Sequence, residues 1–339
     1  MHGYNSEINE GEYIKQLIFF GISIIPMISI YFIDYKKFVI PSYFFYGISV
    51  IALIAVLFTE AKYGAKSWFD FKVFSYQPSE FMKLAYIVCL AKLLSDYDNI
   101  SKIVKNELQK YIYVGVLFTV PFGLILLQPD FGTAIVYFVI TAFILFLNKL
   151  KYRYILVAIL LIAILIPVIY VFGFDDYQKD RINVFLNPKL DPLDTGYNAI
   201  QAEIAVGSGM LFGTGYMQGT QTQLGYLPVK SSDFIFGVLS EELGFMVSSL
   251  IIVLFIILLI RMIKICAETT DNFARYIVIG IVGMIFFHFV QNIGMSLGLL
   301  PITGLPLPFV SYGGSSLITN LLAMAIVLNI SARKSDSFL

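Results

Sequence analysis

Long apolar runs separated by short polar segments are the dominant pattern of this chain, with one exception in its second half. The exception is a Gly-rich polar stretch from Phe174 to Asp233. Apolar runs of this kind are typical of membrane-crossing helices, since about 20 residues span a hydrocarbon core of about 30 Å. The nine runs are Ile14–Ile33, Phe38–Phe58, Glu80–Leu94, Tyr111–Leu127, Gly132–Leu147, Tyr154–Phe172, Phe234–Ile260, Tyr276–Leu299 and Ser315–Ile330.

The composition agrees with this pattern and narrows the fold class. Of the 339 residues, 58% are hydrophobic and 14% are charged, which fits an integral membrane protein better than a soluble domain. Backbone groups exposed to lipid must be hydrogen-bonded within their own segment, so the runs predict helices. We therefore expect an all-α polytopic membrane protein with nine spans. Residues 1–339 would form one membrane domain, and residues 174–233 would form a large loop within it.

Charge and cysteine usage exclude several functional classes. The formal net charge is zero and the chain has no basic stripe, so we expect no nucleic-acid partner. The two cysteines, Cys89 and Cys266, lie in or beside apolar runs, which argues against a disulfide framework and against a cysteine zinc site. The two histidines, His2 and His288, are too far apart in the sequence to suggest a metal cluster.

Basic residues predict the orientation of the spans. Most of the 23 Lys and Arg residues fall in alternate short segments, which are expected to be cytoplasmic. This places the C-terminus inside and the 174–233 loop outside. An odd number of spans also places the acidic N-terminal stretch outside, and one further helix before Met1 would remove that difficulty. The residues assigned to the cytoplasmic side are Lys36, Lys37, Lys92, Lys102, Lys105, Lys110, Lys149, Lys151, Arg153, Arg261, Lys264, Arg275, Arg333 and Lys334.

An acidic and a basic residue stand together at the start of the third run. Glu80 and Lys83 are three residues apart on one helix face, where they can pair. A structural interpretation makes Ser79 the N-cap of a helix in which Lys83 neutralises Glu80. A functional interpretation makes them a pocket pair that meets an anionic substrate, because ionisable groups inside spans are costly.

Four further carboxylates lie at or inside the apolar runs. Asp130 follows Pro129 at a helix break, where it is either a simple N-cap or part of a polar cavity. Asp233 stands where the polar stretch ends, and it too is either an N-cap or a catalytic carboxylate. Glu241 and Glu242 lie two turns deeper, so they form a buried ion pair or face a wet cavity or a cationic partner.

Two other segments carry weaker signals. Tyr197 to Val206 places Tyr197, Ile200 and Ile204 on one side, which suggests a helix lying on the outer leaflet. The pair Gln291-Asn292 inside the eighth run is more typical of hydrogen bonding between helices than of ligand contact.

Taken together, these segments resemble the SEDS family (shape, elongation, division and sporulation), which contains polytopic peptidoglycan glycosyltransferases. The matching stretches run in family order along nearly the whole chain. The amino-acid sequence of residues 219–228 resembles the RodA (elongation) branch more than the FtsW (division) branch. The matching stretches are Gln77–Glu80 with Lys83, Gln128–Asp130 with Gly132-Thr133, Asp191–Tyr197, Gly219–Pro228, Asp233–Phe236 with Glu241–Gly244, and Asn292–Ser316.

The resemblance implies a ten-span fold with both termini cytoplasmic, of which the nine runs would be spans two to ten. The chain therefore looks like a family member without the usual first helix. It also departs from the family where the large loop ends. The family has Pro-Glu, one variable residue and His-Thr-Asp, whereas this chain reads Pro228-Val229-Lys230-Ser231-Ser232-Asp233. Only the aspartate is kept, so this chain lacks whatever the family's Glu and His contribute.

The implied activity is polymerisation of lipid II into glycan strands outside the cell, for cell-wall elongation and cell shape. Asp233 is then the general base, or the ligand of a divalent cation such as Mg²⁺ or Mn²⁺. Lys83 would bind the departing pyrophosphate, oriented by Glu80, with Asp130 as a further polar wall. The other substrate-binding residues expected from the matched motifs are Gln221, Ser311 and Tyr312.

The resemblance also implies a partner and leaves two other functions open. The partner would be a class B penicillin-binding protein, the transpeptidase that cross-links the new strand. A flippase for the same lipid-linked precursor would depend less on Asp233 and more on Glu241 or Glu242. A non-catalytic scaffold for the transpeptidase would tolerate substitution of Asp233, Lys83 and Asp130 alike.

Overall fold

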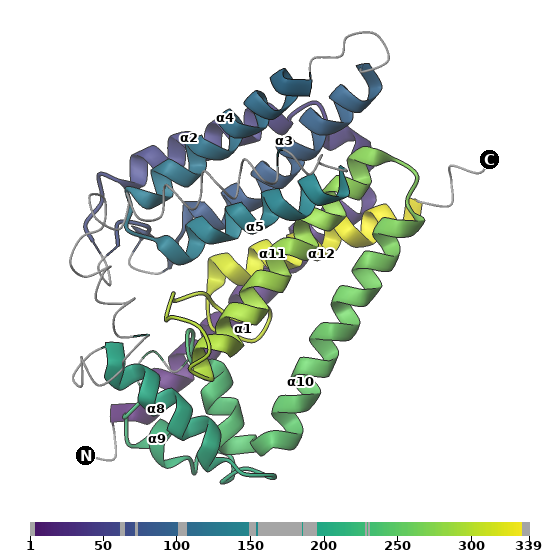
Figure 1. Ribbon diagram of the computed structural model, residues 1–339. Coiled ribbons are helices and arrows are strands. Elements are labelled where there is room, and N and C mark those ends of the chain that lie inside the picture. Colours follow the sequence, from purple (N-terminus) through teal and green to yellow (C-terminus); the bar gives the residue numbers. More distant parts are fainter. Residues whose placement is uncertain are drawn as a thin grey trace. The chain divides into compact units, whose positions relative to one another are not determined.

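Helices account for nearly all regular structure in the computed structural model, which describes residues 4–61, 65–71, 74–100, 107–148, 154, 185, 195–227, 229 and 231–333. Figure 1 labels the helices along the chain. In chain order the elements are α1 (Tyr4–Phe32), the 3-10 helix η1 (Tyr35–Phe38), α2 (Ser42–Val56), β1 (Phe69–Asp70), β2 (Ser75–Tyr76), α3 (Pro78–Ile100), α4 (Glu107–Leu126), α5 (Phe131–Leu147), α8 (Thr195–Ser208), α9 (Thr220–Gln223), α10 (Ile235–Glu268), α11 (Asn272–Ser296) and α12 (Gly314–Arg333).

The observed helices follow the predicted apolar runs closely. Eight of the nine runs coincide with α1, α2, α3, α4, α5, α10, α11 and α12. The remaining run, Tyr154–Phe172, lies outside the described residues apart from Tyr154. Among the described residues, five helices are long and apolar enough to cross a membrane, and α2 and α5 are shorter apolar helices. The expected all-α polytopic membrane fold is therefore confirmed, with one small addition, the antiparallel pair of β1 and β2.

The chain divides into two compact units, and α10 and α11 each contribute to both. The first unit contains Met1–Ile144, Phe255–His288 and Pro308–Leu339, and the second contains Leu145–Leu254 and Phe289–Leu307. The sequence-based expectation that residues 1–339 form one membrane domain stays a prediction.

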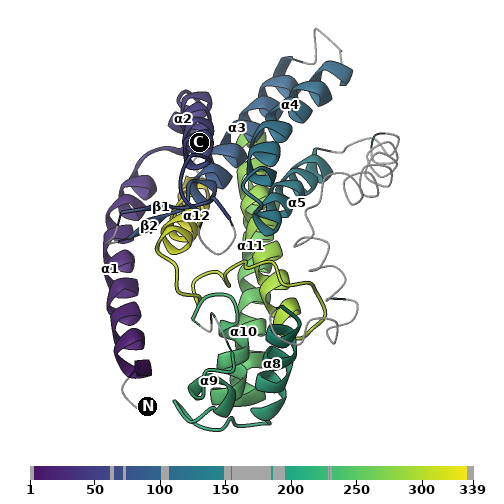
Figure 2. The same cartoon turned by 90° about the vertical axis from the view of Figure 1, so that its left-hand side faces the viewer.

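The first unit is a bundle of apolar helices. In it α2, α3 and α4 pack against one another, and α1 packs along α12 (Figure 2). The end of α1 is held by α12, because the Asn329 side chain donates hydrogen bonds to the carbonyl oxygens of Ile30 and Tyr31, at 2.7 and 2.8 Å. The short β1–β2 ribbon lies beside α12 and leads into α3. These contacts place the first turns of α3 inside the unit.

The second unit contains the described part of the large polar loop. The sequence places a helix near Tyr197–Val206, and α8 confirms it. However, α8 packs through its small residues Ala202 and Ala205, against Leu227 and Phe234, whereas Ile204 is 43% exposed. The loop therefore forms a small apolar core together with the start of α10.

A break in α10 joins that helix to the loop. Gly244 has φ 76° and ψ −177°, which interrupts the helical backbone. The amides of Thr214 and Gly215 donate to the carbonyl oxygens of Glu241 and Glu242, at 2.9 and 3.1 Å. Glycine is required at this point, because a Cβ at residue 244 would collide with the backbone of residues 211–213. Main-chain hydrogen bonds therefore join the loop to the helix.

Candidate functional site

The seven residues expected to act on substrate fall into two groups, one in each unit. The first unit holds Glu80, Lys83, Asp130, Ser311 and Tyr312, and the second holds Asp233 and Gln221. Each group has its own hydrogen-bond network, and the two are described separately.

Glu80 and Lys83 form a buried ion pair in the first two turns of α3. Lys83 Nζ lies 2.8 Å from Glu80 Oε1, and the two side chains are 1% and 3% exposed. The helix begins at Pro78, a residue suited to the first helical position. Ser79 is therefore inside the helix, and its Oγ has no hydrogen-bond partner among the described residues. The expectation that Ser79 caps this helix is wrong, whereas the expected pairing is confirmed.

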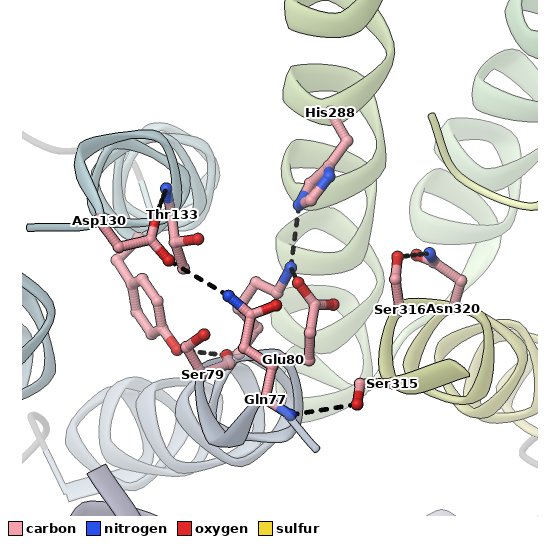
Figure 3. A network of polar contacts seen from close by, with 11 residues as sticks. Gln77, Ser79, Glu80, Asp130, Thr133, His288, Ser315, Ser316 and Asn320 are labelled. Atoms are coloured by element: carbon pink, nitrogen blue, oxygen red, sulfur yellow. Dashed lines mark hydrogen bonds and ion pairs between the residues drawn. The ribbon is translucent and has the colours of Figure 1, made fainter. Parts of the chain in front are cut away.

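A histidine from a distant helix completes this pair. His288, near the end of the first-unit part of α11, has its Nε2 atom 2.9 Å from Lys83 Nζ, and it is 2% exposed. Figure 3 shows its ring directed at the Glu80 side of the network. Sequence reasoning missed His288 as a site residue, because it considered histidines only as metal ligands. The available signal was an ionisable side chain inside an apolar span.

Asp130 both caps α5 and joins α5 to α3. Its Oδ1 atom accepts from the backbone amide of Thr133 at 3.1 Å, as an N-cap does. Its Oδ2 atom accepts from Gln77 Nε2 at 3.2 Å (Figure 3). The interpretation of Asp130 as an N-cap is confirmed, whereas its role in a polar cavity stays a prediction. Burial raises the pKa of Asp130 above its ordinary value of 3.8, the bonds from Thr133 lower it, and the Glu80 charge raises it.

The same network fixes the residues around α3. Tyr137 of α5 donates its hydroxyl to the carbonyl oxygen of Ser79 at 2.8 Å. The backbone amide of Gln77 donates to Ser315 Oγ of α12 at 3.1 Å (Figure 3). One ammonium and two carboxylates are thus held in a buried setting, where charges are weakly screened and act strongly on a bound ion.

Ser311 and Tyr312 lie on the segment that leads into α12. Gln16 of α1 holds this segment from both sides, since its Nε2 donates to the Ser311 carbonyl oxygen and its Oε1 accepts from the Gly313 amide, both at 3.2 Å. Burial, together with the nearby Glu12 charge, raises the pKa of the Tyr312 hydroxyl. Their role in substrate binding stays a prediction.

In the second unit, Asp233 lies two residues before α10 and is held through its main chain. Its side chain accepts from Ser232 Oγ at 2.8 Å. Its backbone carbonyl oxygen accepts from Asn292 Nδ2 of α11, also at 2.8 Å. Gly304, with φ 71°, passes so close that a Cβ there would lie 3.3 Å from Asp233 Oδ2. The carboxylate is therefore bordered by a residue that has no side chain.

Glu241 anchors the end of the polar loop. Its carboxylate accepts from the amides of Gln221 and Thr222, at 2.8 and 3.0 Å, and from the Thr222 hydroxyl. These amides belong to the first turn of α9, so a negative charge stands at a helix N-terminus, which is favourable. Glu242 accepts from Gln223 Nε2 at 3.1 Å. In the described residues both glutamates bind the loop, so a buried ion pair is not what they form.

Gln221 has one side-chain atom available for a ligand. Its backbone amide is used by Glu241, while its Oε1 is buried and has no hydrogen-bond partner among the described residues. The pair Gln291-Asn292 makes structural hydrogen bonds, but to main-chain carbonyl oxygens outside the helices and not between helices as expected: Gln291 Nε2 donates to the Pro301 carbonyl oxygen at 2.7 Å. Within the described part of the chain, no group of three or more His, Cys, Asp or Glu residues could hold a metal ion.

Comparisons with known proteins cover almost the whole chain. The FTSW_RODA_SPOVE family model, described as "Cell cycle protein", matches residues 4–336. Peptidoglycan glycosyltransferase MrdB of Escherichia coli K12 is 40% identical over 79% of this chain and 71% of its own length. Stage V sporulation protein E of Bacillus subtilis is 38% identical over 94% and 86%. A solved structure of a peptidoglycan synthase complex, which concerns the coordination of polymerization and crosslinking, superposes with a TM-score of 0.82. It is 28% identical and covers 95% of this chain and 90% of that one.

Proposed function

The chain belongs to the FtsW/RodA/SpoVE family, and on this premise we propose that it is a peptidoglycan glycosyltransferase that polymerises lipid II into glycan strands. The family resemblance carries the reaction, and one observation in this chain supports it most directly. That observation is the buried Lys83 ammonium, which is held by Glu80 instead of being exposed to water. A cation placed in this way suits a substrate whose leaving group is a pyrophosphate.

The reaction joins two sugars and releases a lipid pyrophosphate. A hydroxyl oxygen of the acceptor sugar attacks the anomeric carbon of the donor, and the bond from that carbon to the pyrophosphate oxygen breaks. The pyrophosphate departs with the bonding electron pair and gains negative charge. Lys83 stabilises this charge, and Glu80 sets the direction of its ammonium group.

Asp233 acts on the acceptor. As a general base its carboxylate takes the proton that the attacking hydroxyl loses. The carboxylate also suits a divalent cation, because Mg²⁺ is often bound by one or two carboxylates together with substrate phosphates. A bound cation would supply Lewis-acid activation of the acceptor or of the leaving group. In either role Asp233 depends on the bonds from Ser232 and Asn292.

The chain is a multi-pass membrane protein, and its orientation follows from the basic residues as a proposal. The loop of residues 174–233 and Asp233 face the outside, while the C-terminus, with Arg333 near it, faces the cytoplasm. The elongation branch of the family is the role we favour, since residues 219–228 resemble that branch. The match to a peptidoglycan synthase complex supports a class B penicillin-binding protein as partner.

Polymerisation of labelled lipid II by the purified protein tests the proposal. The assay includes a transpeptidase-dead class B penicillin-binding protein and compares wild type with Asp233→Asn, using Asp96→Asn on α3 as a matched control. Glycan ladders from wild type and the control, and none from Asp233→Asn, are expected. EDTA treatment followed by addition of Mg²⁺ or Mn²⁺ separates the two roles of Asp233. Ladders that disappear with EDTA and return with the cation support the role of a cation ligand, and ladders that EDTA leaves unchanged support the general base. A wild type that makes no ladders with its partner present would contradict the proposal.

A further inference from the structure

A neutral nitrogen atom is the second hydrogen-bond partner of the Lys83 ammonium. Nζ lies 2.8 Å from Glu80 Oε1 and 2.9 Å from His288 Nε2, and all three side chains are buried. The two partners come from different helices, α3 and α11, and His288 is 205 residues away from Lys83 in the sequence. The contact therefore ties the ammonium to a second element of the first unit.

The chemistry of the two groups determines which atom donates. A lysine ammonium has three N–H donors and no acceptor, so His288 Nε2 must accept. An Nε2 that accepts carries no proton, so the ring is neutral and its proton is on Nδ1. Glu80 Oε1 accepts from the same ammonium at 2.8 Å, so the two N–H donors used here point to two different acceptors.

We propose that His288 is a positioning residue, which acts through Lys83 as a neutral acceptor and leaves the third Lys83 N–H for a pyrophosphate oxygen of the substrate. The inference rests on the proposed function. Among the described residues Lys83 has two hydrogen-bond partners, so one donor remains for a ligand.

A neutral acceptor suits this position better than a second carboxylate. Glu80 already balances the Lys83 charge, so a second carboxylate hydrogen-bonded to Nζ would add negative charge beside a departing pyrophosphate. Glu80 lies on the same helix as Lys83, so by itself it restrains the flexible four-carbon side chain of Lys83 from one direction only. His288 adds a second direction without reducing the net charge of the group. A misplacement of about 1 Å at such a position costs on the order of 10²-fold in rate.

Two substitutions that differ in the reach of one amide test this role. In His288→Gln the amide reaches about as far as Nε2, so it can accept from Lys83. In His288→Asn the amide stops near the Nδ1 position, so it cannot. We expect His288→Gln to keep most lipid II polymerisation. His288→Asn should lower kcat about 100-fold with little change in KM, because the leaving group gains charge only in the transition state. Thermal unfolding checks that both variants are folded.

Selective ¹⁵N-histidine labelling provides a readout that needs no activity. The chain has two histidines, so His2→Ala leaves His288 as the only labelled ring. We expect a protonated Nδ1 and an unprotonated Nε2, with the Nε2 resonance shifting in Lys83→Met. A protonated Nε2, or equal kcat values for wild type, His288→Gln and His288→Asn, would overturn the inference. A wild type that does not polymerise would instead reject the proposed function, while the resonances still test the contact.

Discussion

The side-chain amide of Asn292 donates a 2.8 Å hydrogen bond to the backbone carbonyl oxygen of Asp233. The same Nδ2 atom donates a second bond, also 2.8 Å, to the carbonyl oxygen of Leu305. One buried amide of α11 therefore positions both the residue expected to act on the acceptor and the segment that passes beside it. The contact is within the second unit and does not depend on the Lys83 network.

Replacing Asn292 by Ala should destabilise this unit and impair polymerisation. The change leaves two carbonyl oxygens without a donor, and an unsatisfied buried polar group costs about 1–3 kcal/mol. Ser296→Ala is the matched control, because among the described residues the Ser296 hydroxyl bonds only to the carbonyl oxygen of Asn292, one turn earlier in the same helix. The unfolding temperature and the yield of glycan ladders should both fall for Asn292→Ala and change little for Ser296→Ala. Equal behaviour of the two variants would show that the Asn292 bonds do not hold Asp233.

Breaking the Glu80–Lys83 pair should cost more stability than removing it entirely. Lys83→Met leaves a buried carboxylate unpaired, for which about 3–5 kcal/mol is typical. The double variant Glu80→Gln/Lys83→Met has no unpaired charge, so its unfolding temperature should lie above that of Lys83→Met. Neither variant should polymerise lipid II, because both lack the ammonium. Polymerisation at the wild-type rate by the double variant would remove Lys83 from the mechanism.

Asp130→Asn should be at least as stable as wild type at neutral pH. Burial raises the pKa of Asp130, so the folded state favours the protonated form. That contribution is complete below the ordinary pKa of 3.8 and is lost as the pH rises through the folded-state value. Asparagine carries no charge, its Oδ1 can keep the Thr133 bond, and its Nδ2 can donate to the Gln77 side-chain oxygen once that amide is turned over. Unfolding temperatures measured from pH 7 downward should converge toward pH 3.8. A variant that becomes relatively less stable as the pH rises would contradict the raised pKa.

Glu241 and Glu242 should differ sharply in their importance. Glu241→Ala removes the acceptor of two α9 amides, and loss of such a cap typically costs about 1 kcal/mol. Glu242→Ala removes one contact with the Gln223 side chain. We expect limited proteolysis to cleave near residues 219–227 faster in Glu241→Ala, with polymerisation reduced in proportion. A flippase predicts instead that both substitutions stop lipid transport in vesicles while the loop stays intact.

Periodicity and length were sufficient to predict the membrane helices, but side-chain contacts were harder to predict. The runs mark α1 to α5 and α10 to α12 because lipid forces long apolar segments to be helical. The Glu80–Lys83 pair was also predictable, since a spacing of three places both residues on one face. The two-residue strands β1 and β2 are too short to leave a period in the sequence.

Contacts between segments far apart in the chain could not be predicted in this way. Two partners of Glu241 are main-chain amides about twenty residues earlier, and main-chain groups have no sequence signature. His288 meets Lys83 only because α3 and α11 pack together, and spacing along the chain carries no information on that packing. The start of α3 at Pro78 shows a different difficulty. Ser79 is a favoured N-cap residue by type, yet the helix has already begun one residue before it.

The break at Gly244 divides α10 into two parts whose helical registers are set separately. In an uninterrupted helix, one inserted or deleted residue turns everything beyond it by about 100°, so a change in the span would rotate the part next to Asp233. Here that part takes its register from the main chain of the loop. Residues 245–268 extend about 36 Å, enough to cross the bilayer by themselves. One residue inserted among exposed positions such as Leu250 and Leu254 should therefore rotate only the part of the span beyond it and leave the surroundings of Asp233 as they are.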